Sequence, residues 1–135
     1  MNKNFQLDIV TPTKTVFSGQ VESFTAPGVV GSFQVLFNHA PLLSSIGIGE
    51  VKLHSEDGRT SRYATSGGFV EVKSNKVVLL AESAEESGEI DIQRAEEAKR
   101  RAEERLHTKH SEIDYERAES ALLRSINRLK IASLK

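Results

Sequence analysis

The uneven distribution of glycine, proline and phenylalanine constrains the fold of this chain more than any other feature. All nine glycines, all three prolines and all six phenylalanines lie in residues 1–88 of the 135-residue sequence, and residues 89–135 contain none of them. Glycine and proline favour turns and weaken helices, whereas aromatic residues are enriched in strands. The sequence therefore predicts two domains, with residues 1–88 forming strands and residues 89–135 forming helices.

Residues 1–88 contain short apolar or alternating runs separated by turn signals such as Asp57-Gly58. The expected strands cover residues 5–10, 16–17 with 21–26, 32–37, 48–54, 60–65, 69–72 and 77–81. Closely spaced strands without intervening helical periodicity are typical of a β-sandwich or flattened barrel. Residues 77–81 are apolar throughout, which predicts a strand that is buried on both faces.

Residues 89–135 show helical periodicity in two segments, separated by a short break at 107–111. Asp91 and Asp114 are placed to cap the two helices. The expected apolar faces consist of Ala95, Ala98, Ala102 and Leu106 in the first helix and Ala118, Leu122, Ile126 and Leu129 in the second. A short connection predicts an antiparallel hairpin. Because its apolar face is thin and mostly alanine in the first helix, this helical tail is expected to be less stable than the β domain and able to detach from it.

Composition excludes several classes of function. The net charge of −1 argues against nucleic-acid binding through a basic surface, and the absence of cysteine excludes disulfides and thiolate chemistry. Residues 1–16 have no continuous apolar run, so we expect neither a signal peptide nor a membrane span there, and a soluble intracellular protein. His39 has no Ser/His/Asp arrangement nearby, and His107 with His110 lacks further ligands, so neither a hydrolase nor a metal site is expected.

Four arginines in the tail form a candidate anion site. Arg94 and Arg101 share a face of the first helix, as do Arg124 and Arg128 on the second. In an antiparallel hairpin, the start of one helix lies beside the end of the other, so the four guanidinium groups could converge and bind phosphate. The alternative is that these arginines lie on a solvated helix surface.

Several segments, taken in order, resemble the epsilon subunit of bacterial F-type ATP synthase. They are Asn38-His39-Ala40-Pro41-Leu42, Ser66-Gly67-Gly68-Phe69, Ile90-Asp91-Ile92-Gln93-Arg94-Ala95 and Asn127-Arg128-Leu129. The resemblance covers essentially the whole chain. The segment 31–37 departs from the family, with Gln34 where a second glycine is usual and Phe37 where proline is usual.

The resemblance implies a non-catalytic, peripheral subunit of the central stalk at the cytoplasmic face of the bacterial membrane, with no required cofactor. The β domain would contact the gamma subunit and the ring of c subunits, with His39 and Pro41 as candidate rotor contacts. The tail would either fold onto the β domain or extend toward the alpha and beta subunits, where it inhibits ATP hydrolysis.

The resemblance also implies an ATP site in the folded tail of some members. Its motif falls on Ile90, Asp91, Arg94 and Ala95, with the acidic position on Glu85 and the helical arginines on Arg101, Arg124 and Arg128. Asp91 would then be both a helix cap and part of a nucleotide site. The alternatives are a stand-alone ATP-sensing module and a helical adaptor or nucleic-acid binder.

Overall fold

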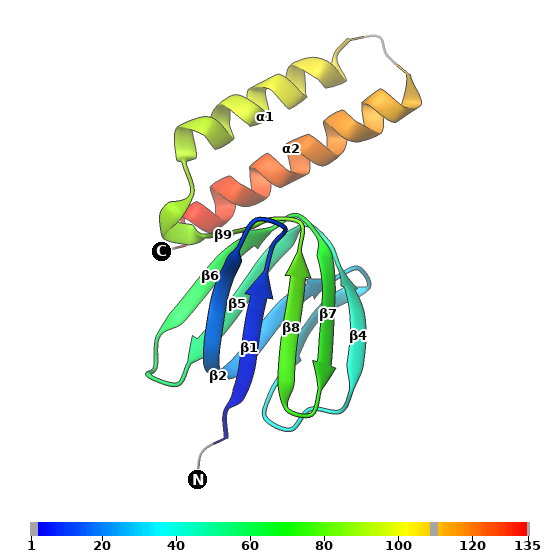
Figure 1. The fold of residues 1–135 in the computed structure, drawn as a ribbon. Coiled ribbons are helices and arrows are strands. Elements are labelled where there is room, and N and C mark those ends of the chain that lie inside the picture. The colour runs from blue at the N-terminus through cyan, green and yellow to red at the C-terminus, as the bar shows by residue number, and fades with distance from the viewer. Residues whose placement is uncertain (1–2, 109–110, 135) are drawn as a thin grey trace.

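The structure is a computed structural model that describes residues 3–108 and 111–134. A β domain is followed by two helices that lie side by side above one end of it (Figure 1). The strands are β1 (Phe5–Val10), β2 (Thr15–Gly28), β3 (Gly31–Val35), β4 (Leu42–Ile46), β5 (Gly49–Ser55), β6 (Thr60–Thr65), β7 (Gly68–Lys73), β8 (Lys76–Ala81) and β9 (Ala84–Glu86). They lead through the 3₁₀ turn η1 (Ser87–Glu89) to α1 (Ile92–Leu106) and α2 (Glu112–Ala132).

The strands form a β-sandwich that is closed on one side through the long strand β2. The hydrogen-bonded order runs β1-β8-β7-β4-β2-β5-β6-β9, β3 also pairs with β2, and β2 returns to pair with β1. β1 is parallel to β8, whereas its pairing with β2 is antiparallel. The predicted fold class, a β-sandwich or flattened barrel followed by a helical hairpin, is confirmed.

Three strands differ most from the prediction. β9 was not predicted, because its three residues are too few to show an alternating pattern. Residues 42–46 form β4, which pairs with β7 along its length, although Ser44-Ser45 interrupts the apolar pattern there. β8 is buried on one face rather than both, because Leu80 is 56% exposed while Val77 and Leu79 are buried. The continuous apolar run arises because the outer face of this strand is also apolar.

The core of the β domain is made of inward-facing residues from both layers. Its largest fully buried side chains are Phe5, Leu7, Ile9, Val21, Phe24, Val35, Val51, Leu53, Val70, Val72 and Leu79. Burying large aliphatic and aromatic side chains contributes about 1.5–3 kcal/mol each before the entropy cost of ordering them. The β domain therefore holds most of the apolar burial of the chain.

The helical hairpin packs through small residues, as predicted for the first helix but not for the second. Ala95 and Ala102 of α1 are buried, as are Ala118, Ser125 and Ala132 of α2, each seven residues from the next. The predicted face of α2 was wrong at Ile126, which is 43% exposed. Ser125 is buried instead, and its hydroxyl donates to the carbonyls of Ala121 and Leu122.

The helix caps are partly as expected. Asp91 caps α1, because its Oδ1 accepts a hydrogen bond of 3.1 Å from the Arg94 backbone N–H. The prediction that Asp114 caps α2 was wrong: Ser111 is the cap, and its hydroxyl accepts from the Asp114 N–H at 3.2 Å. Asp114 lies in the first turn, where its negative charge still favours the helix amino end.

Candidate functional site

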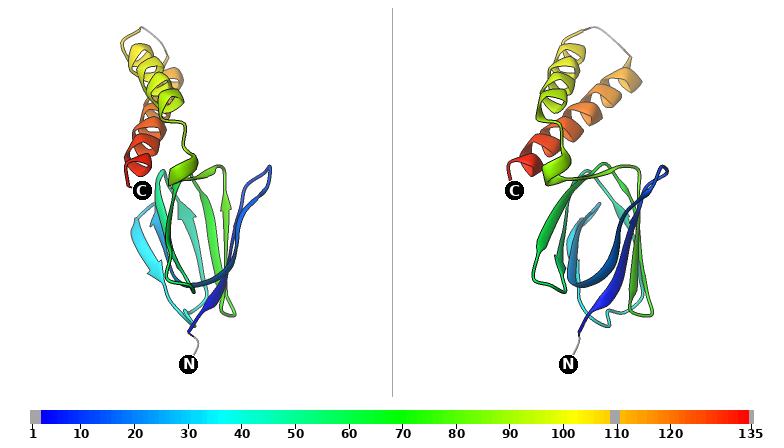
Figure 2. Two further views of the ribbon diagram at one scale, coloured as in Figure 1. Left: turned by 90° about the vertical axis from the view of Figure 1, so that its left-hand side faces the viewer. Right: turned by 60° about the vertical axis from the view of Figure 1, so that its left-hand side comes forward.

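The tail rests on the β domain through the carboxyl-terminal end of α2. Figure 2 shows the end of α2 beside η1, while the other end of the hairpin projects away from the sheets. A small apolar cluster joins the two domains, made of Ala64 from β6, Ile90 after η1, and Ile131 with Ala132 from α2. Two of these four side chains are alanine, so the apolar attachment is weak compared with the core of the β domain.

Two consecutive residues of α2 make polar links to the β domain. Asn127 donates from Nδ2 to the Gly49 carbonyl at 2.9 Å. Arg128 Nε lies 2.7 Å from Glu85 Oε1, and Arg128 Nη2 donates to Glu85 Oε2 at 3.1 Å. The Nε–H does not point along a hydrogen-bond direction, so this ion pair contains one aligned hydrogen bond. These links fix the angle at which α2 meets β5 and β9.

A cavity of about 280 Å³ lies between the top of the β domain and the two helices. Its lining combines small apolar residues, hydroxyls, one carboxylate and two guanidinium groups: Ala64, Thr65, Ser66, Ser83, Glu85, Ala98, Ala121, Arg124, Ser125, Asn127 and Arg128. The Ser66 and Ser83 hydroxyls share a hydrogen bond of 2.7 Å, which joins the β6–β7 connection to the β8–β9 connection. The lining thus offers cationic groups and hydrogen-bond donors around a space that alanines leave open, a combination that suits a polar, anionic ligand.

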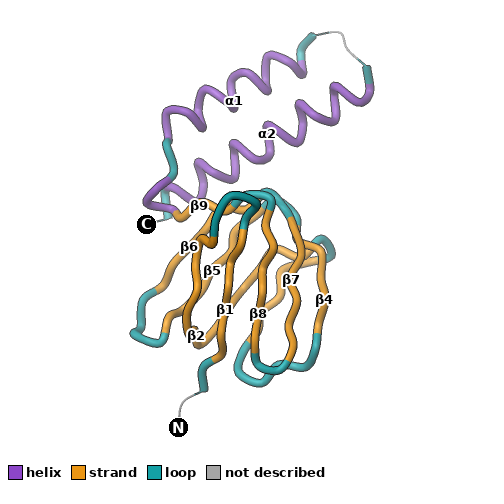
Figure 3. Tube along the Cα trace, in the orientation of Figure 1, coloured by secondary structure: helices purple, strands orange, loops and turns teal. Residues whose placement is uncertain are grey.

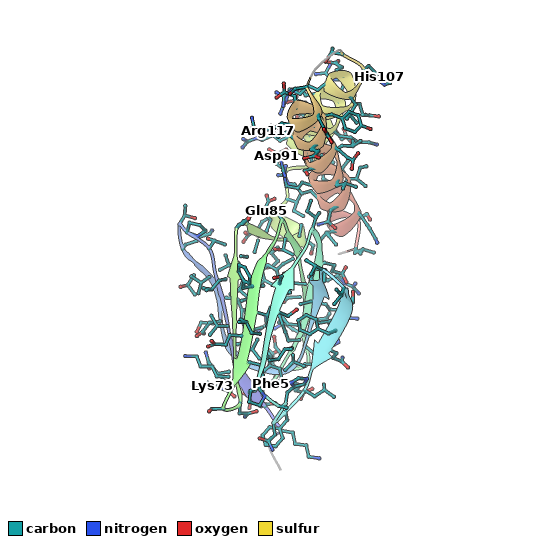
Figure 4. The ribbon with its side chains drawn as sticks, turned by 90° about the vertical axis from the view of Figure 1, so that its right-hand side faces the viewer. Phe5, Lys73, Glu85, Asp91, His107 and Arg117 are labelled. Atoms are coloured by element: carbon teal, nitrogen blue, oxygen red, sulfur yellow. The ribbon has the colours of Figure 1, made fainter. Side chains whose placement is uncertain are left out.

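Three of the eight predicted ATP-site residues line this cavity, namely Glu85, Arg124 and Arg128. Glu85 lies at the top of the β domain, and Asp91 lies above it, beside the helices (Figure 4). Asp91 and Arg94 are exposed, and the Arg94 backbone is the partner of the Asp91 cap. Ile90 and Ala95 are buried as packing residues.

Of the four arginines expected to converge, the structure brings two to the cavity, Arg124 and Arg128 of α2. Arg94 and Arg101 are exposed on α1 and are absent from the described lining of the cavity. The helical spacing placed each pair on one face, but it could not give the rotation of α1 about its own axis. Here α1 turns its alanines, including Ala98, toward α2 and the cavity.

Sequence reasoning missed the hydroxyl and amide groups of the cavity. Ser125 had a signal, because Ala118, Ser125 and Ala132 are spaced by seven residues and form one seam of small side chains. Ser66, Ser83 and Asn127 had no such signal. They come together only because α2 packs beside the β6–β7 and β8–β9 connections, which the sequence pattern does not reveal.

The loop with the candidate rotor contacts lies at the other end of the β domain, far from the tail. The Asn38 N–H donates to Asn75 Oδ1 at 2.8 Å, and Asn75 Nδ2 donates to the Asn4 carbonyl at 3.0 Å, which holds the loop near the β7–β8 turn. His39 Nδ1 lies 2.7 Å from the Ala40 carbonyl, and Pro41 is exposed. In Figure 4, Phe5 and Lys73 mark this end of the domain.

The outer face of β4, β7 and β8 carries three exposed apolar side chains together with a charged one, since Glu71 lies opposite Leu43 on β4 and opposite Val78 on β8. Leu43, Phe69 and Leu80 are 71%, 55% and 56% exposed, and Phe69 lies opposite Leu80 in the β7–β8 ladder. Figure 3 shows these three strands adjacent in one layer of the sandwich. Large apolar side chains gathered on one exposed face are typical of a surface that contacts another protein.

Residues 3–108 and 111–134 contain no group of three or more His, Asp or Glu side chains arranged to hold a metal ion. His107 is at the end of α1, and His110 lies outside the described residues. Among the described helices, none is long and apolar enough to cross a membrane.

The fold and its two domains define a class of protein, a β-sandwich followed by a long helical domain. Residues 4–87 match the β-sandwich domain of the ATP synthase delta/epsilon chain, and residues 89–133 match the long α-helix domain of the same chain. This chain therefore belongs to the ATP synthase delta/epsilon family.

Relatives over nearly the full length agree with this assignment. The ATP synthase epsilon chain of Desulforamulus reducens is 47% identical, with 98% of this chain and 99% of the relative covered. The epsilon chains of Nitratidesulfovibrio vulgaris and Bacillus cytotoxicus are 47% and 44% identical, with coverage of at least 97% of both chains. The resemblance to the epsilon subunit that the sequence motifs indicate is confirmed.

Solved structures show the same fold at lower identity. A chain in the Euglena gracilis mitochondrial ATP synthase OSCP/F1/c-ring structure has a TM-score of 0.82 at 22% identity, with 100% of this chain and 84% of that chain covered. A chain in the central stalk/c-ring structure of the Tetrahymena thermophila mitochondrial ATP synthase has a TM-score of 0.69 at 14% identity, with 94% and 95% covered.

Proposed function

We propose that this chain is a non-catalytic central-stalk subunit of a bacterial F-type ATP synthase, bound peripherally at the cytoplasmic face of the membrane complex. Its family, and relatives named epsilon chain that match it over nearly their full length, support this role. Two surfaces are proposed to contact the gamma subunit and the c ring. One is the outer face of β4, β7 and β8, with its exposed Leu43, Phe69 and Leu80, and the other is the loop with His39 and Pro41.

We propose further that the tail moves between this docked position and an extended one that obstructs ATP hydrolysis. The observation that carries this proposal is the weak attachment of the tail, which among the described residues consists of an apolar cluster of four side chains, one ion pair and one hydrogen bond to a carbonyl. If α1 and α2 joined into one helix over residues 92–132, it would reach about 60 Å at 1.5 Å per residue. That length suits a contact with the alpha and beta subunits.

ATP is proposed to bind the docked tail at the cavity of Arg124 and Arg128. These guanidinium groups would bind phosphate oxygens, and Arg94 and Arg101 could join them from α1 through their long side chains. Glu85 is held by Arg128, which engages its carboxylate and disfavours a role in activating a water molecule. ATP would favour the docked position in proportion to its preference for that position over the extended one.

Hydrolysis by the assembled ATP synthase tests the movement of the tail. We expect the complex carrying a chain that ends at residue 88 to hydrolyse ATP several-fold faster than the complex with the full chain. An unchanged rate, with the shortened chain shown to be present in the complex, would contradict the inhibitory role. Turnover of ATP by the pure isolated chain would contradict the non-catalytic assignment.

Calorimetric titration of the isolated full chain with ATP tests the site separately. We expect binding that the Arg124→Ala, Arg128→Ala variant loses and that Arg117→Ala retains. Arg117 is on the same helix but nearer the other end of the hairpin and is not part of the described lining of the cavity, so this change controls for the loss of a helical arginine away from the site. Equal loss in both variants would show a general charge effect rather than a site.

A further inference from the structure

A second cavity, of about 330 Å³, opens on the outer face of β5 and β6. None of its described lining residues is shared with the first cavity. The described lining is mostly basic and hydroxyl-bearing: Lys52, His54, Thr60, Arg62, Ser87 and Leu134.

The register of β5 and β6 brings the basic groups together. Lys52 is directly opposite Arg62, and His54 is directly opposite Thr60. Because alternate residues of a strand point to the same face, these four side chains share the outer face. Like charges directly opposite each other in an antiparallel ladder are destabilising, so the Lys52–Arg62 pair carries a cost that an anion between them would offset.

One neighbouring carboxylate, that of Glu50, balances part of this charge. Arg62 Nη1 lies 3.3 Å from Glu50 Oε2, a partly exposed ion pair that leaves other guanidinium N–H groups free to donate. Lys52 forms no ion pair with any described residue. His54 Nδ1 and Thr60 Oγ1 are 2.7 Å apart, so these two side chains orient one another at the cavity edge.

A helix carboxyl end carries partial negative charge, so the end of α2 is an alternative partner for the basic groups of β5 and β6. Its last turn is, however, satisfied locally. The Ser133 N–H donates to the carbonyls of Leu129 and Lys130, and the Leu134 N–H donates to the Ile131 carbonyl. The basic groups of β5 and β6 therefore remain available to a ligand.

We propose that this cavity is an oxyanion site that takes a phosphate group, either as free inorganic phosphate or as the phosphate of a mononucleotide. Lys52 supplies a mobile ammonium charge, Arg62 supplies paired N–H donors, and the hydroxyls of Thr60 and Ser87 complete the hydrogen bonding. The site is independent of the cavity at Arg124 and Arg128.

Amide NMR spectra of the full chain, titrated with inorganic phosphate at constant ionic strength, test the proposal. We expect saturable shift changes in the amides of Lys52, Thr60, Arg62 and Ser87. Lys52→Gln should weaken the apparent affinity about tenfold, as expected for loss of one charge-assisted hydrogen bond. Lys14→Gln, which makes the same charge change at an exposed loop, should leave the affinity unchanged.

Two further measurements distinguish free phosphate from a nucleotide phosphate, and this cavity from the one at Arg124 and Arg128. Saturation by adenosine monophosphate at the same amides would show that the site accepts a nucleotide phosphate, and saturation by inorganic phosphate alone would show a site for the free anion. The Arg124→Ala, Arg128→Ala variant should bind phosphate here as the unmodified chain does. Shifts that rise linearly, or that are the same in Lys52→Gln, would overturn the proposal. So would loosening of α2 in Lys52→Gln without any saturable phosphate effect, because the basic groups would then serve the helix end.

Discussion

Arg128 of α2 and Glu85 of β9 are 43 residues apart in sequence and form the ion pair that joins the tail to the β domain, with Nε 2.7 Å from Oε1. Both residues also line the cavity proposed for ATP. The same guanidinium group therefore holds the tail in place and faces this cavity. A phosphate proposed to bind there would have to share Arg128 with the Glu85 carboxylate.

Replacing Glu85 by glutamine should loosen the tail and leave the β domain intact. The pair is partly exposed, with side chains 25% and 36% accessible, so its loss should cost about 1 kcal/mol. We expect amide hydrogen exchange over residues 92–132 to be several-fold faster. The exchange of β7 and β8 amides should not change. Glu103→Gln, an exposed change on α1, is the control, and equal acceleration in it would contradict a role for the pair.

The division of the chain into strands and helices could be predicted because it rests on local chemistry. Glycine, proline and phenylalanine occur only in residues 1–88, before the helices begin, and Asp91 caps α1 through a contact within its own turn. β4 could not be predicted in the same way. Leu43 faces outward and Ser45 is half-buried, so the apolar pattern of this strand does not separate its two faces.

The candidate site could be predicted residue by residue but not in its geometry. Glu85, Arg124 and Arg128 line one cavity because α2 packs against the end of β5 and β6, a relationship between segments far apart in sequence. Arg94 and Arg101 have the expected spacing, yet the alanine seam of α1 decides which face turns inward. Packing of small residues therefore sets the direction of the arginines.

Gly68→Ala should destabilise the β domain by several kcal/mol. Gly68 has φ +145°, and an added Cβ would meet the Leu80 carbonyl oxygen and the backbone of Ala81. Both the backbone conformation and the β7–β8 pairing would have to shift. Urea unfolding measures the loss. Gly88→Ala, where φ is ordinary and the added Cβ would meet nothing within 4 Å, should change stability by less than about 0.5 kcal/mol. Similar losses in both variants would contradict this explanation.

Alkaline pH should weaken the fold through Tyr63. Burial, followed by the charges of Glu86 and Glu89, raises the pKa of Tyr63 from its ordinary value of 10.0 to about 12. Between these two values the unfolded chain loses a proton that the folded chain keeps, so the free energy of unfolding falls as pH rises, by about 1.4 kcal/mol per pH unit at most. Below pH 10 this contribution is fully present.

Tyrosinate absorbance measures this directly. The sequence has two tyrosines, so in Tyr115→Phe the remaining signal belongs to Tyr63 and should titrate near pH 12. Tyr63→Phe should remove the alkaline decrease in the free energy of unfolding. A midpoint near pH 10 in folded Tyr115→Phe would show that Tyr63 is solvated.

Two substitutions at Asp91 should separate its role as a helix cap from a role in ligand binding. Asn caps a helix about as well as Asp, whereas Ala does not. Asp91→Ala should therefore cost about 1 kcal/mol of tail stability, and Asp91→Asn should cost little, as measured by hydrogen exchange over α1. If Asp91 also contacts ATP through its charge, calorimetry should show weaker ATP binding in Asp91→Asn while its helix remains protected. ATP binding that is unchanged in Asp91→Asn and weakened in Asp91→Ala would make Asp91 a helix cap alone, since the ligand would then sense only the order of the first turn.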